Sequence, residues 1–206
     1  MTESRRAVLD RIRAALAAAP ADAVQVPRDY DRTPAAGPGD ADRFAEALCE
    51  YRAQVLRVDV TDVAATIAGL IRSGGRLVVP PDLPDAWVHG LDVTRDGVEN
   101  PLPVTELDRA DAVVTGCALG IAATGTIVLD AGAAQGRRAL TLVPDHHVCV
   151  VFTDQIVDTV PQAFAALDPL RPLTFISGPS ATSDIELNRV EGVHGPRTLD
   201  VLLVRR

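Results

Sequence analysis

Residues 54–79 constrain the fold more than any other stretch. Gln54–Val60 alternates polar and apolar residues, as a half-buried strand does. We expect an amphipathic helix to start at Thr61 and to end at Ser73–Gly75, before a short apolar strand at Leu77–Val79. Two strands joined by a helix over so short a distance run parallel, which predicts an α/β fold.

Other apolar runs extend this pattern to a mixed, mainly parallel sheet with flanking helices. Asp40 is placed to cap a helix through Tyr51. A second helix is expected from Thr153 to Ala166, and Pro161 should kink it or split it. The other expected strands are 112–115, 127–129, 148–152, 173–176 and 199–204.

The first part of the chain differs in character from the rest. Ser4–Ala19 has apolar residues at helical spacing, and the stretch that follows contains four prolines. We therefore divide the chain into an N-terminal helix at 1–19, a Pro/Gly linker at 20–39 and one α/β domain at 40–206. The pattern leaves open whether the helix docks on its own domain or on a partner.

Composition excludes several classes of function. The chain has no lysine, so a Schiff-base lysine and a phosphate-loop lysine are ruled out. A net charge of −8 and an aromatic content of 3% argue against nucleic-acid binding. Cys49, Cys117 and Cys149 are far apart, which indicates reduced cysteines in a cytoplasmic core and no metal site. No apolar run is long enough to predict a membrane span.

The segment 177–197 carries the most polar chemistry and lies between two predicted strands. A turn at Ser177–Pro179 leads into Ser180 and Thr182, and a second tight corner includes Gly195 and ends at Arg197. N–H groups after the Gly178 turn, together with the hydroxyls, can hold a carboxylate or phosphate without lysine. The same hydroxyls equally suit a helix cap.

Three residues of this segment are candidates for acid–base chemistry. Asp184 and Glu186 would share one face of a strand but diverge on a helix, so a carboxylate pair requires the strand. A structural ion pair of Asp184 with Arg197 or Arg137 is the alternative. His194, held in a glycine corner, could serve as a general acid or base, or could bond backbone to hold the corner.

A second candidate region supplies ligand-binding residues. Thr124, Gly125 and Thr126 form a corner between predicted strands. Arg137 and its neighbour Arg138 follow a Gly/Ala-rich loop and could close over an anionic substrate; solvation at the surface is the commoner role of such arginines. His146 and His147 begin a strand, so they should face opposite sides and share no metal ion. The predicted ligand-binding set is Thr124, Gly125, Thr126, Arg137, Gly178, Ser180, Thr182, Gly195 and Arg197.

Together these regions resemble the lactate-utilisation (LUD) domain family, over most of residues 40–206. The motifs that carry the resemblance are 121–129, 142–147, 177–186 and 192–196. The resemblance implies an α/β fold like that of ribose-5-phosphate isomerase, glucosamine-6-phosphate isomerase and the CoA transferases. It also implies a bacterial, cytoplasmic role in oxidising L-lactate to pyruvate with iron–sulfur partner proteins. Ala123 stands where the family often has Glu, so carboxylate chemistry is not expected there.

Two functions follow as hypotheses. The first is an ancillary subunit, as a single chain or a homo-oligomer, that binds a small anionic metabolite and carries no cofactor, with iron–sulfur clusters on its partners. The alternative is an isomerase or acyl-transferase acting on a sugar phosphate or CoA ester, with His194, Asp184 and Glu186 as catalytic residues. Both need the corner after Ala123 and the corner after Ser177 to meet in one pocket.

Overall fold

The computed structural model describes residues 3–17, 25–29, 39–72, 74–182, 190–191 and 195–205. The chain divides into two compact units, Met1–Thr33 and Pro34–Arg206, which we describe separately. The first contains helix α1 (Glu3–Ala17), on which Val8, Ile12 and Leu16 are all exposed. Within the described ranges, no helix combines the length and the apolar character needed to cross a membrane.

Among the described residues, six strands form the larger sheet of the second unit, and every neighbouring pair is parallel. The strand that is last in the chain, Thr198–Arg205, is second in the sheet, between the edge strand and His146–Phe152, so residues 195–197 lie at the sheet's amino edge. In order across the sheet, the strands are β1 (Gln54–Asp59), β12 (Thr198–Arg205), β7 (His146–Phe152), β4 (Ala112–Thr115), β2 (Leu77–Val79) and β3 (Val93–Arg95).

A smaller, mixed sheet lies beside the parallel one. In it, β6 pairs antiparallel with both β5 and β9, and β5 and β8 run parallel. The predicted mainly parallel α/β fold is confirmed, but its strands separate into two sheets, and β9 and β12 belong to different ones. The order is β8 (Ile156–Val157), β5 (Leu119–Ile121), β6 (Thr126–Leu129) and β9 (Thr174–Ile176); β10 (Ala181–Thr182) and β11 (Val190–Glu191) pair separately.

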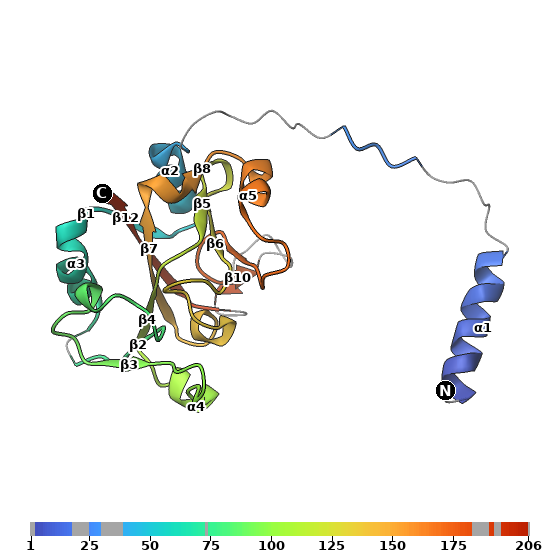
Figure 1. Cartoon of the computed structure of the whole chain (residues 1–206), viewed down its shortest axis with the longest axis horizontal. Coiled ribbons are helices and arrows are strands. Elements are labelled where there is room, and N and C mark those ends of the chain that lie inside the picture. Colours follow the sequence, from blue (N-terminus) through green and yellow to red (C-terminus); the bar gives the residue numbers. More distant parts are fainter. Residues whose placement is uncertain are drawn as a thin grey trace. The chain divides into compact units, whose positions relative to one another are not determined.

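Within the second unit, two helices and the small sheet cover the two faces of the large sheet (Figure 1). On one face, α2 (Ala41–Glu50) and the small sheet share a buried cluster with β7 and β12, in which Phe44 and Leu48 are fully buried. On the other face, α3 (Val63–Leu70) packs against Leu202 and Val204. Within the described ranges, two shorter helices and five 3₁₀ turns complete the unit: α4 (Val104–Leu107), α5 (Val160–Ala166), η1 (Val60–Asp62), η2 (Asp85–Trp87), η3 (Ala122–Thr124), η4 (Arg138–Thr141) and η5 (Thr153–Gln155).

Some helix boundaries follow the sequence and others correct it. Asp40 caps α2 as predicted, because its carboxylate accepts the N–H groups of Asp42 and Arg43. The helix expected from Thr61 starts later, after a 3₁₀ turn. The helix expected over 153–166 was wrong: η5 and β8 come first, and Pro161 lies in the first turn of α5, where proline needs no N–H partner.

Gly125 fixes how the corner after Ala123 sits on α2. It has a left-handed φ of 55° and ends the turn η3. A Cβ at this position would lie 2.7 Å from the backbone of Ala47 and Leu48, which is closer than side chains approach. The corner therefore packs directly on α2 backbone.

We expect Gly125→Ala to lower the free energy of unfolding by roughly 2 to 4 kcal/mol, through the strained φ and the clash with α2. Gly69→Ala is the control: Gly69 lies on α3 with open space around it, so alanine should stabilise by about 0.5 to 1 kcal/mol. Urea unfolding measures both. Equal stability of the two variants would contradict this close packing.

Candidate functional site

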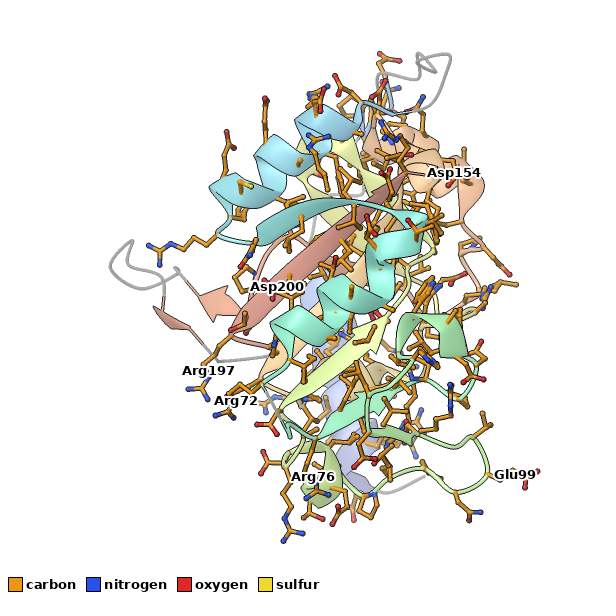
Figure 2. The ribbon with its side chains drawn as sticks, turned by 90° about the vertical axis from the view of Figure 1, so that its left-hand side faces the viewer. Arg72, Arg76, Glu99, Asp154, Arg197 and Asp200 are labelled. Carbon is orange, nitrogen blue, oxygen red and sulfur yellow. The ribbon has the colours of Figure 1, made fainter. Side chains whose placement is uncertain are left out.

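Three of the predicted ligand-binding residues, Gly178, Ser180 and Gly195, line one cavity of about 520 Å³. His147 and Leu199 lie near the first residues of β7 and β12, so the cavity opens at the amino edge of the large sheet. Figure 2 shows this edge at Arg197 and the carboxyl edge at Asp154. The other lining residues are Tyr51, Arg138, Thr141, Leu142, Thr174, Phe175, Ile176, Ser177, Pro179 and Pro196.

The turn after β9 is held in place from both sides. The N–H of Ser180 donates to the carbonyl of Pro196 at 2.7 Å, which joins the turn to the approach to β12. Gly178 has a φ of 108°, and a Cβ there would lie 2.7 Å from the Cβ of Tyr51. The loop therefore closes tightly against the C-terminus of α2, and glycine is required at the contact.

Hydroxyl groups connect the corner after Ala123 to this loop. The Oγ1 atoms of Thr124 and Thr126 are 2.7 Å apart, and Thr126 Oγ1 is 2.7 Å from Ser177 Oγ. However, Thr124 and Thr126 line a neighbouring apolar cavity of about 360 Å³, which shares Phe175 and Ser177 with the larger one. The two corners meet through Ser177, but only one of them faces the larger cavity.

The adjacent histidines point to opposite faces of the large sheet, as predicted. His146 Nε2 lies 2.7 Å from Asp200 Oδ2 on the α3 side. His147 is buried on the other side, where its Nε2 lies 2.8 Å from Thr115 Oγ1. The pair cannot ligate one metal ion, and His147 alone belongs to the cavity.

Below His147 lies a buried pair of thiols. Thr115 Oγ1 is 3.9 Å from Cys149 Sγ, so the histidine connects to sulfur through one hydroxyl. Hydrogen bonding from the Cys117 thiol and from His147 lowers the pKa of Cys149, against the effect of burial. The same contact with Cys149, together with burial, raises the pKa of Cys117 well above its usual value. A negative charge on this pair is therefore favoured at Cys149.

Arg138 is the arginine that the structure brings to the cavity. Its side chain is exposed, and among the described residues no carboxylate pairs with it. The predicted Arg137 instead bonds Asp96, with Nε 2.7 Å from Oδ2, and lines a different cavity. Arg197 pairs with Asp145. An arginine without a carboxylate partner is the side chain best suited to bind an anion bidentately.

The remaining predicted residues have other positions. Gly125 packs on α2, and Thr182 lies in β10, where only its backbone is described. The predicted catalytic residues Asp184, Glu186 and His194 lie outside the described residues. The helix-cap alternative for Ser180 concerns the same undescribed stretch, and the catalytic assignments stay predictions.

Sequence reasoning missed Tyr51 and His147 as lining residues. Tyr51 was predicted as the last residue of the helix capped by Asp40, but it follows α2 and its exposed side chain lines the cavity. A signal for His147 was present, because strand alternation places it on the same face as Cys149. The missing information was which face of β7 meets the polar loop.

A parallel sheet with a smaller mixed sheet on one face, and a polar cavity at its amino edge, defines an α/β domain with a candidate small-molecule site. The family model described as LUD domain matches residues 41–204, and the chain belongs to this family. It is 51% identical over 167 residues to "Lactate utilization protein C" of Deinococcus radiodurans, covering 79% of this chain and 78% of the relative.

Two further comparisons agree with this membership. A protein of the same name from Geobacillus kaustophilus is 31% identical, over 70% of this chain and 71% of the relative. The crystal structure of a DUF162 family protein from D. radiodurans aligns with a TM-score of 0.67 and 43% identity, covering 79% of this chain and 94% of that one. The shared fold therefore extends over most of the α/β unit.

The hydroxyl chain gives a direct test of the junction between the corners. Thr126→Val keeps the shape of the side chain but removes the hydroxyl that bonds both Thr124 and Ser177, so we expect a loss of ~1 to 2 kcal/mol in the free energy of unfolding. Thr94→Val, at an exposed position on strand β3, is the control and should stay within about 0.5 kcal/mol. Urea unfolding measures both variants. If Thr126→Val lowers the free energy of unfolding no more than the control does, the hydroxyl hydrogen bonds contribute nothing to stability.

Proposed function

We propose that this protein is a subunit that supports the utilisation of L-lactate and binds a small carboxylate in the cavity at the amino edge of the large sheet. Relatives up to 51% identical carry the name "Lactate utilization protein C", which supports a role in lactate utilisation. The observation that carries the ligand class is Arg138, exposed at the cavity with no carboxylate partner among the described residues. Lactate and pyruvate are both small carboxylates.

The cavity offers a carboxylate several kinds of donor. The Arg138 guanidinium can supply two parallel N–H groups, and the hydroxyls of Ser177 and Ser180 can donate from the loop. His147 adds a ring nitrogen from the floor, held by Thr115. Leu199 and Phe175 supply apolar wall for a methyl group. This mixture suits a short 2-hydroxy or 2-oxo acid.

Oxidising lactate to pyruvate removes two electrons and two protons, and we assign the electron carriers to partner proteins. The sequence has no clustered cysteines and no dinucleotide glycine fingerprint. We therefore propose that iron–sulfur proteins accept the electrons, while this chain holds the carboxylate. His194, Asp184 and Glu186, which lie outside the described residues, remain the proposed acid–base residues.

Calorimetric titration with L-lactate and with pyruvate tests the site. Arg138→Ala should weaken binding roughly tenfold or more, because it removes charge-assisted hydrogen bonds. Arg109→Ala is the control, since Arg109 is exposed, pairs with Glu106 and lies away from the cavity. Binding unchanged in Arg138→Ala would contradict the assigned site. Binding of sugar phosphates or CoA esters, without lactate or pyruvate, would favour the isomerase or acyl-transferase alternative.

Growth of D. radiodurans, which has the 51% identical relative, tests the role in lactate utilisation. A D. radiodurans strain lacking that relative should grow poorly on L-lactate, and this chain should restore growth. Normal growth on L-lactate after the deletion would contradict the proposed role.

A further inference from the structure

At the carboxyl edge of the large sheet, the chain's connections diverge between β2 and β4. From β2 the chain leads to β3 on one side, whereas from β4 it leads through the small sheet to β7 on the other. In open parallel sheets, such a divergence leaves a crevice outside the carboxyl ends of the strands, where ligands commonly bind. This edge is opposite to the one that holds the Arg138 cavity.

In this protein the chain itself fills the crevice with residues 131–136. The carbonyl of Ala134 accepts the N–H of Gly116, which follows β4, at 2.7 Å. The N–H of Ala134 donates to the carboxylate of Asp82, which follows β2, at 2.9 Å. Ala134 is only 9% exposed. One residue of the loop thus satisfies the donor and the acceptor that the two strand ends present.

Cavities lie on both sides of this loop. One, of about 510 Å³, is lined by Asp82, Gly132 and Arg137. The other, of about 610 Å³, is lined by Cys117, Gln155 and again Gly132. The loop is therefore a partition, and its withdrawal would join the two cavities into one crevice.

The loop is strained but keeps its own shape. Ala131 and Ala134 have φ values of 54° and 59°, a left-handed conformation that costs free energy for any residue with a Cβ. Its base is clamped internally, because the Gln135 side chain bonds both the N–H and the carboxylate of Asp130, at 2.6 and 2.9 Å. Among the described residues, its hydrogen bonds to the ends of β2 and β4 are the two made by Ala134.

We propose that residues 131–136 form a displaceable plug, and that the crevice it covers binds an uncharged molecule with an amide or similar adjacent donor and acceptor. The donor replaces the Ala134 N–H at Asp82, and the acceptor replaces the Ala134 carbonyl at the Gly116 N–H. Anions are disfavoured, because the arginines that line the two cavities are paired: Arg137 with Asp96 and Arg171 with Asp130. Further carboxylates line the walls at Asp82, Asp154 and Asp168.

The reactivity of the Cys117 thiol should show whether the plug is in place, and no ligand is needed to measure it. Cys117 lines the cavity beside Gly132, yet it is only 5% exposed, and its Sγ lies 3.7 Å from Gln155 Oε1. The neighbouring thiol and burial keep its pKa high, so it should react slowly while the plug is in place. Withdrawal of the plug should expose Cys117, whereas Cys149 is fully buried in the core cluster and lines neither of the two cavities.

The test measures alkylation of Cys117 in the full chain, with Cys49→Ser removing the exposed thiol. Asp82→Ala removes the carboxylate that holds Ala134, and we expect iodoacetamide to modify Cys117 roughly tenfold faster. The control is Asp85→Ala, because Asp85 is close in sequence but pairs with Arg95 and not with the loop. The double variant Ala131→Gly, Ala134→Gly relieves the strain and should slow the reaction.

Within the Asp82→Ala variant, iodoacetate, the anionic analogue, should modify Cys117 more slowly than iodoacetamide does, when each rate is taken relative to the rate on the unfolded chain. Mass spectrometry of peptides separates Cys117 from Cys149. Equal rates in Asp82→Ala and Asp85→Ala, or labelling of Cys149 in step with Cys117, would overturn the plug. Equal relative rates for the two reagents within the Asp82→Ala variant would overturn the preference for uncharged molecules.

Discussion

The structure depends on the packing of the small sheet and α2 across one face of the parallel sheet. Phe44 and Leu48 of α2, Ile127 of β6 and Val201 of β12 belong to one buried cluster. With few aromatic residues in the chain, this contact is almost entirely aliphatic, so its stability comes from close approach rather than from large rings. Gly125 allows such a close approach, because without a side chain the corner after Ala123 can contact the backbone of α2.

This packing creates different chemistry at the two edges of the large sheet. At the amino edge, β9 of the small sheet ends beside the start of β12, and the turn from Ser177 to Ser180 encloses a polar cavity with Arg138. At the carboxyl edge, where α/β sheets commonly bind ligands, the 131–136 loop occupies the crevice. The loop runs directly into Arg137 and Arg138, so one stretch of chain forms the proposed plug and supplies the cation of the proposed carboxylate site.

Local signals in the sequence were sufficient for the parallel fold. The Asp40 cap, the alternation in β1 and the opposed histidines of β7 each depend on neighbours within a few residues. The helix predicted over 153–166 failed because Ile156 and Val157 pair with β5, a contact that no local pattern reveals. The choice between Arg137 and Arg138 also depended on a distant residue, Asp96, which pairs with the first and leaves the second exposed at the cavity.

The proposed function depends most on a small carboxylate binding between Arg138 and the loop after β9. An NMR titration of the ¹⁵N-labelled full chain with pyruvate tests this directly, because backbone amides report the place of binding. If pyruvate binds there, the chemical shifts of the amides of Gly178, Ser180 and Gly195 should change to saturation, and those of Gly116 and Ala134 should stay unchanged. Shifts confined to Gly116 and Ala134 would place the anion at the opposite edge and contradict the proposed function.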